Sequence, residues 1–198
     1  MKDLNFPLRF KFHISTLSND FTATDANGQV VAFVRQKMFK LKEAVNVYSD
    51  QQKSRLLFTI AADRWLDFNA AYSFREVDGS ELGKIVRKGW RSIWKVHYEL
   101  IDQHQQLQYH IREENAWIKV LDGLIGEIPF LNVLTGYLFN PAYLVLDLQG
   151  NTVIRLEKTP SFFGRKFEVI KVQEIDQDDS ERIMLGLMMM VLLERRRG

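Results

Sequence analysis

The stretch that decides the fold is Ile183-Met184-Leu185-Gly186-Leu187-Met188-Met189-Met190-Val191-Leu192-Leu193, eleven residues without a polar side chain on any face. A helix that is apolar all round must be surrounded by other apolar groups. At about 1.5 Å per residue the stretch spans about 16 Å, and it falls short of the roughly 20 residues that a membrane-spanning helix needs. We therefore predict a helix over 178–195 that is buried inside protein, with Asp178 or Asp179 as its N-cap.

The segments before this helix predict antiparallel strands. Apolar and polar residues alternate through most of the chain, and short turns at 25–28, 78–79 and 149–151 contain the glycine that tight hairpins favour. The clearest alternation runs from Trp94 to Ile111. About 10–12 strands at a spacing of about 8–12 residues predict a barrel or sandwich. A barrel that wide leaves space in its lumen, and the apolar, methionine-rich helix would fill it.

Composition favours one intracellular domain. The 198 residues include no cysteine, which excludes disulfides, thiolate zinc sites and cysteine nucleophiles. The first residues lack the apolar run of a secretory signal, so we expect a cytoplasmic protein, peripheral at the inner membrane if it binds lipid. The net charge of +2 is too small to favour nucleic acid as a partner. We expect a single domain over 1–198, and the sequence gives no oligomeric state.

The order of these elements resembles the tubby C-terminal domain, the LURP-one-related proteins and the phospholipid scramblases over about residues 10–195. The segments that carry the resemblance are the basic pair 34–42, then 83–89, Asn140-Pro141-Ala142-Tyr143 and the closing helix. The resemblance implies a mainly β fold, a closed antiparallel barrel around a hydrophobic C-terminal helix, and binding of anionic lipids at basic positions. The scramblases' proline-rich leader and cysteine cluster are absent from the sequence. Residues 176–179 are similar to the acidic calcium segment of the scramblases, but they lack the 12-residue loop with a central glycine that an EF-hand uses.

Two cationic segments supply the candidate lipid site. Arginine would grip a phosphate bidentately and lysine would act as a point charge if both segments converged on one headgroup. The candidate headgroup ligands are Arg35, Lys37, Lys40, Lys42, Arg87, Lys88 and Arg91, with Lys95 beside them. Trp90 and Trp94 are the candidate membrane contacts. The alternative for the cations is a solvated strand face that discourages aggregation, and the alternative for the tryptophans is a place in the core.

No motif predicts catalysis or a metal. His97 and His110 would face each other across a hairpin, but zinc needs three or four ligands and no third is apparent. Gly79, Gly83 and Gly89 do not form a phosphate-binding loop followed by a helix. We therefore expect a non-enzymatic protein without a cofactor or a metal site.

Two classes of function stay open. The first is a module that binds anionic phospholipid or phosphoinositide headgroups at the membrane surface. The second is a soluble scaffold or ligand-binding barrel that contacts a protein partner. The apolar segment 115–139 is expected to form a buried helix and loop, although a surface that touches lipid is the alternative.

Overall fold

The computed structural model describes residues 1, 4–13, 19–37, 44–63, 70–88, 97–114, 142–159 and 166–195, without the side chains of Lys37 and Arg195. Within these ranges the chain forms twelve strands and one helix. The elements are β1 (Leu8–Phe12), β2 (Phe21–Thr24), β3 (Val30–Lys37), β4 (Ala44–Tyr48), β5 (Leu56–Ala62), β6 (Ala71–Glu76), β7 (Glu81–Arg87), β8 (His97–Asp102), β9 (Leu107–Glu113), β10 (Ala142–Leu146), β11 (Thr152–Thr159), β12 (Lys166–Lys171) and α3 (Gln177–Arg195).

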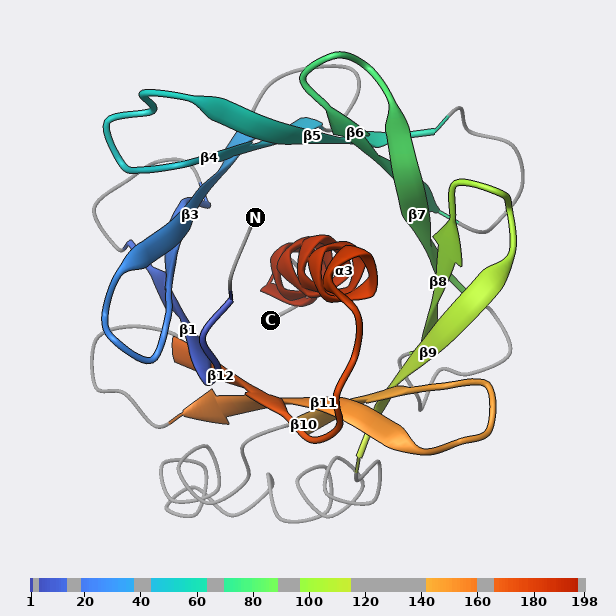
Figure 1. The fold of residues 1–198 in the computed structure, drawn as a ribbon. Coiled ribbons are helices and arrows are strands. Elements are labelled where there is room, and N and C mark those ends of the chain that lie inside the picture. The colour runs from blue at the N-terminus through green and yellow to red at the C-terminus, as the bar shows by residue number, and fades with distance from the viewer. Residues whose placement is uncertain are drawn as a thin grey trace, which may run out of the picture.

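The strands form one closed antiparallel barrel. Each strand pairs with its neighbours in the sequence, and β1 pairs with β12 to complete the ring (Figure 1). Phe10 of β1 lies opposite Phe167 of β12, so apolar side chains meet on the inner face where the ring closes. The predicted barrel is confirmed, and its strand number lies at the upper end of the expected range.

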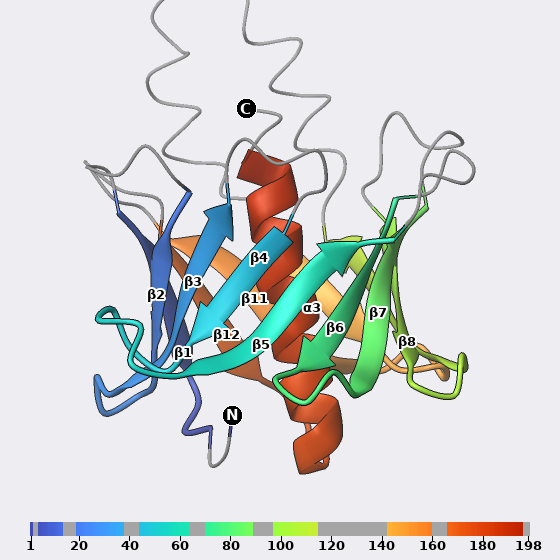
Figure 2. The same cartoon turned by 90° about the horizontal axis from the view of Figure 1, so that it is seen from above.

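Five tight hairpins gather at one end of the barrel (Figure 2). Each turn begins with an aspartate whose carboxylate accepts backbone N–H groups of the same turn at 2.8–3.1 Å. These aspartates are Asp25, Asp50, Asp78, Asp102 and Asp147. Glycine supplies the positive φ angle in the three hairpins that the sequence predicts, at Gly28, Gly79 and Gly150. The turn chemistry therefore fixes the register of the strand pairs.

Helix α3 passes through the barrel lumen (Figures 1 and 2). Its apolar residues from Ile183 to Leu192 are at most 1% exposed, apart from Gly186, which is also buried. They pack against inward residues of the strands such as Phe10, Ile60 and Leu156 in one continuous core. The predicted central helix is confirmed, because an all-round apolar surface is covered by barrel wall on every side. Within the described residues, no helix is both long and apolar enough to cross a bilayer.

Polar contacts hold the first turn of α3. The N-cap is Asp176, whose carboxylate accepts the Asp179 N–H at 2.8 Å, so the prediction of Asp178 or Asp179 as the cap is wrong by two or three residues. The earlier cap leaves Asp179 free to accept a hydrogen bond from the Tyr109 hydroxyl at 2.5 Å. Arg182, only 6% exposed, pairs with Asp179 and donates to the carbonyl oxygen of Leu82 at 2.9 Å.

A second polar group holds the other end of α3. The Tyr98 hydroxyl donates to Glu194 Oε1 at 2.8 Å. Burial raises the pKa of Tyr98, and the nearby Glu194 carboxylate raises it further. Burial likewise raises the pKa of Tyr143, with a further contribution from Glu194. Both phenols therefore stay protonated, and Tyr98 can donate to the helix end at all ordinary pH values.

Two glycines permit close packing around the helix. Gly83 in β7 has a φ of +134°, and a Cβ there would lie 2.3 Å from the carbonyl oxygen of Ile101 and 3.2 Å from Cδ of Arg182. A Cβ on Gly186 of α3 would lie 2.5 Å from Cδ2 of Leu100 in β8. Neither position has room for a side chain, because the helix and the β7–β8 wall are in direct contact there.

Candidate functional site

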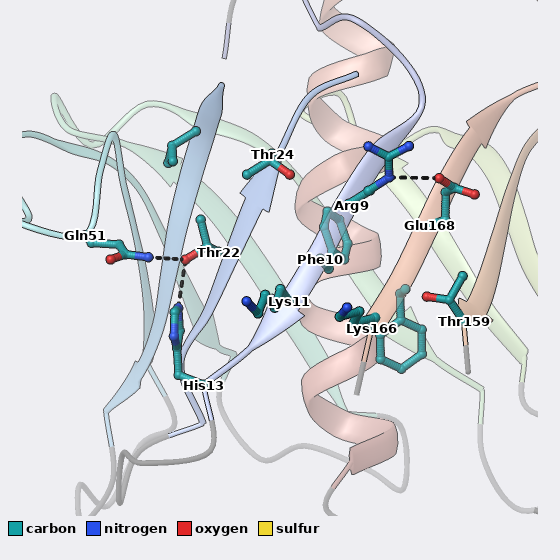
Figure 3. A pocket seen from close by; sticks show the side chains of 12 residues that line it. Arg9, Phe10, Lys11, His13, Thr22, Thr24, Gln51, Thr159, Lys166 and Glu168 are labelled. Atoms are coloured by element: carbon teal, nitrogen blue, oxygen red, sulfur yellow. Dashed lines mark hydrogen bonds and ion pairs between the residues drawn. The ribbon is translucent and has the colours of Figure 1, made fainter. Parts of the chain in front are cut away.

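A groove of about 500 Å³ lies on the outer wall where the barrel closes. Its floor comes from β1 and β12, with flanking residues from β2, β11 and the β4–β5 turn (Figure 3). We call it the seam groove. The side chains of Arg9, Lys11 and Lys166 give it three cationic groups, and Glu168 is an anionic one. The alternation of each strand explains this arrangement, because Phe10 and Phe167 point into the core and their neighbours point out.

Two lysines lie directly opposite each other in the seam groove. Lys11 of β1 is the cross-strand partner of Lys166 of β12, and both side chains are exposed. The same row continues to Thr22 of β2 on one side and Thr159 of β11 on the other. Among the described residues, no carboxylate lies within 4.0 Å of either ammonium group. The row therefore places two unneutralised charges between two hydroxyl-bearing side chains.

Other polar groups of the seam groove are paired with one another. Arg9 donates from Nε to Glu168 Oε1 at 3.1 Å, so this pair is neutral and lies across β1 and β12 (Figure 3). The Thr22 hydroxyl accepts from Gln51 Nε2 at 3.0 Å and lies 2.8 Å from His13 Nε2. The net positive charge of the groove therefore concentrates on the lysine pair.

The described cations of the predicted lipid site lie in different places. Arg35 is on the outer face of β3, with Nε 4.0 Å from Asp20 Oδ2. Lys88 follows β7, and its ammonium group lies 2.9 Å from Glu99 Oε2. Strands β4, β5 and β6 separate β3 from β7 in the ring, which corresponds to about 19 Å along the wall at about 4.8 Å per strand. The described parts of the two strands therefore do not converge on one headgroup.

Arg87 lies on the same face of β7 as core residues. It has the same parity in β7 as the buried Ile85, and its positive charge lowers the pKa of Tyr72 and Tyr98 against the raising effect of burial. Arg87 is therefore half-buried on the inner side at the mouth of the barrel, and its role as a headgroup ligand stays a prediction. Of Lys37, only the backbone is described.

The other predicted contacts lie outside the described residues. These are Lys40, Lys42, Trp90, Arg91 and Trp94, together with Lys95 and the apolar segment 115–139. Their proposed roles stay predictions.

The expectation that no third ligand accompanies His97 and His110 is wrong. Glu99 lies on the same face, and the three side chains place ligand atoms within 4.8 Å of one another. Burial lowers the pKa of His97, and the charge of His110 lowers it further, so the His97 ring is neutral at neutral pH. The local signal was present in the sequence as His97-Tyr98-Glu99, because residues two apart on a strand share a face.

The seam groove was not predicted from the sequence. Arg9 and Lys11 alternate with buried residues in β1, which indicates an outer face but not what lies beside it. Only the β1–β12 pairing brings Lys166 next to Lys11. Comparison with protein-family models, curated proteins and solved structures finds no significant match to this chain.

Proposed function

We propose that this chain is a non-enzymatic, tubby-like lipid-binding module that holds the phosphate of an anionic phospholipid headgroup in the seam groove. The observation that carries the proposal is the direct opposition of Lys11 and Lys166. Like charges directly opposite on neighbouring strands destabilise a sheet unless something neutralises them. A phosphate between the two ammonium groups removes this repulsion and gains two charge-assisted hydrogen bonds.

The surroundings of the lysine pair suit a phosphorylated headgroup. Thr159 and Thr22 extend the row on both sides and offer hydroxyl groups to the polar part of the ligand. Val30, 44% exposed, lines the same groove and gives it an apolar contact beside the charges. A lipid presents both kinds of surface, whereas inorganic phosphate presents only the charge. The resemblance to lipid-binding families points to the same class of ligand.

Vesicle sedimentation tests the proposal. The wild-type chain is mixed with phosphatidylcholine vesicles, with vesicles that also contain phosphatidylserine, and with vesicles that contain a phosphoinositide. The Lys11→Gln/Lys166→Gln variant should lose affinity for the anionic vesicles about 30-fold, since each basic residue near an anionic surface contributes about 1 kcal/mol. Binding should also weaken with salt, because exposed charges are screened over about 8 Å at 0.15 M.

The matched control is Lys84→Gln/Lys171→Gln. It removes the same charge from lysines outside the groove, which bond to Gln105 and Glu174. Equal loss in both variants would show general attraction to the surface and would contradict the groove. If soluble inositol phosphate competes with the vesicles and binds as tightly as they do, the site would be assigned to a free phosphorylated ligand. A wild-type chain that never sediments with anionic vesicles would favour the scaffold function.

The sequence-predicted cations need a separate variant. Replacing Arg87, Lys88 and Arg91 by glutamine tests them in the same assay. Its melting temperature must be compared with that of the wild type, because the charge of Arg87 acts on the buried Tyr72 and Tyr98. Loss of vesicle binding by a stable triple variant, with the seam variant unaffected, would move the site to the β7 side.

A further inference from the structure

His97, Glu99 and His110 form a compact group on the outer wall of the β8–β9 hairpin. One potential ligand atom from each residue lies within 4.8 Å of the other two. The group is far from the seam groove, because β8 and β9 lie on the opposite part of the ring from β1 (Figure 1). It therefore requires an explanation of its own.

The hairpin register brings these side chains together. His97 and Glu99 are two residues apart on β8 and share its outer face, since Tyr98 and Leu100 between and beyond them are fully buried. His110 is the direct cross-strand partner of Glu99. Its ring centroid lies 5.3 Å from that of His97. The wall beneath the group is packed against α3, so the three Cβ positions are held by a rigid support.

The atoms of this group have unused bonding capacity. His110 Nδ1 is buried and has no hydrogen-bond partner among the described residues. A buried polar atom without a partner is costly, and such atoms in native proteins often mark a missing ion or water. All three side chains are partly buried, which limits competition from bulk water.

We propose that His97, Glu99 and His110 bind one divalent transition-metal ion of the zinc class. Two imidazoles and one carboxylate suit Zn²⁺, Co²⁺, Ni²⁺ or Fe²⁺ better than Mg²⁺ or Ca²⁺, which prefer all-oxygen ligands. Three protein ligands leave at least one coordination position for water or an exogenous group. The ligand atoms need to move closer only by side-chain rotation, because the strand register already places them on one face.

Two cations compete with the metal. The Lys88 ammonium group lies 2.9 Å from Glu99 Oε2. Arg112 is exposed on the same outer face as the direct cross-strand partner of His97. A bound metal therefore replaces Lys88 as the partner of Glu99. Removing the Lys88 charge should therefore increase the affinity for the metal. Nonspecific binding to surface histidines would not show this effect.

Titration of the full chain with Zn²⁺, followed by competition with a chromophoric chelator, tests the proposal. The wild type should bind one ion per chain. His97→Asn, Glu99→Gln and His110→Asn should each weaken binding at least about 10-fold, because even the loss of a supporting group around a metal costs 10- to 100-fold. Lys88→Gln should bind Zn²⁺ up to about 5-fold tighter, since a partly exposed ion pair is worth at most about 1 kcal/mol.

The matched control is His104→Asn, which removes a histidine from the neighbouring turn of the same hairpin. Its affinity for Zn²⁺ should equal that of the wild type. Equal weakening by His104→Asn, or wild-type binding no tighter than that of Glu99→Gln, would overturn the proposal.

A second measurement on the wild type avoids the risk that a variant unfolds. Co²⁺ should broaden the imidazole NMR signals of His97 and His110 before those of His13 and His104, and an unselective effect would refute the site. Vesicle binding by the Glu99→Gln variant should be unchanged, so the failure of this site and the failure of the seam groove are separable.

Discussion

Substitution of Gly186 by alanine should lower stability in the wild-type protein and raise it when Leu100 is shortened. Alanine in place of glycine inside a helix ordinarily stabilises by about 1 kcal/mol. Here the new Cβ would lie 2.5 Å from Cδ2 of Leu100, and both positions are fully buried. Overpacking of that kind costs about 1–3 kcal/mol, so the net change in Gly186→Ala should be a loss of about 1 kcal/mol.

The Leu100→Ala background removes the atoms that the new methyl group meets. Leu100→Ala alone should cost about 2–5 kcal/mol, because it leaves a cavity. Adding Gly186→Ala should then raise the free energy of unfolding by about 1 kcal/mol through helix propensity. Because the same substitution lowers it by about 1 kcal/mol in the wild type, the coupling energy between the two positions is about 2 kcal/mol. Leu156→Ala is the matched control, since it opens a cavity at another fully buried leucine of the wall. In that background Gly186→Ala should remain destabilising.

Equilibrium urea unfolding measures the free energy of unfolding of the wild type and of each single and double variant. Melting temperature gives a second readout, with about 2–4 °C expected per kcal/mol in a chain of this size. The reasoning is refuted if Gly186→Ala stabilises the wild type as much as the Leu100→Ala variant. That result would mean that α3 and β8 are not in contact at this position.

Three further perturbations test other parts of the fold. Met189→Asp places an unpaired charge at a fully buried position and should reduce the free energy of unfolding by several kcal/mol, whereas Met189→Leu should cost less than about 1.5 kcal/mol; an unchanged melting temperature for the aspartate variant would show that α3 is exposed. Gly83→Ala should destabilise the chain by more than about 2 kcal/mol, because it combines a positive φ with a clash against the Ile101 carbonyl; circular dichroism melting would detect a tolerated alanine. The Ser80 hydroxyl and N–H lower the pKa of Asp78, so its contribution to stability should be fully present above the ordinary aspartate pKa of about 3.9 and should disappear as pH falls through the lower folded value. Urea midpoints measured between pH 7 and pH 3 should fall less for Asp78→Asn than for the wild type as the pH is lowered. Parallel curves for the two proteins would contradict this.

The fold was predictable because its signals are local. An apolar stretch longer than one turn and without a polar face identifies α3, and the glycine turns at Gly28, Gly79 and Gly150 identify hairpins whose strands must pair. The helix cap was misplaced because several acidic residues lie close together there, and only backbone geometry distinguishes Asp176 from its neighbours.

The candidate sites were less predictable for two different reasons. The lysine pair of the seam groove depends on contact between strands at opposite ends of the sequence, and alternation alone does not give that register. The metal-ligand group lies within one hairpin, and His97 opposite His110 was anticipated. Glu99 was not anticipated, because a carboxylate two positions along β8 looks in the sequence like any charged residue on an exposed strand face.

The position of α3 in the chain has a consequence for how the protein folds. The strands from β1 to β11 can form successive hairpins as they emerge from the ribosome, since each needs only its neighbour. Their inner faces stay uncovered until β12 closes the ring and α3 fills it. The nascent chain therefore passes through a stage with an open, apolar sheet and two unpaired edges, which is the kind of intermediate that aggregates or recruits chaperones. Completion of the core therefore waits for the synthesis of β12 and α3, and the speed of that synthesis should influence the soluble yield.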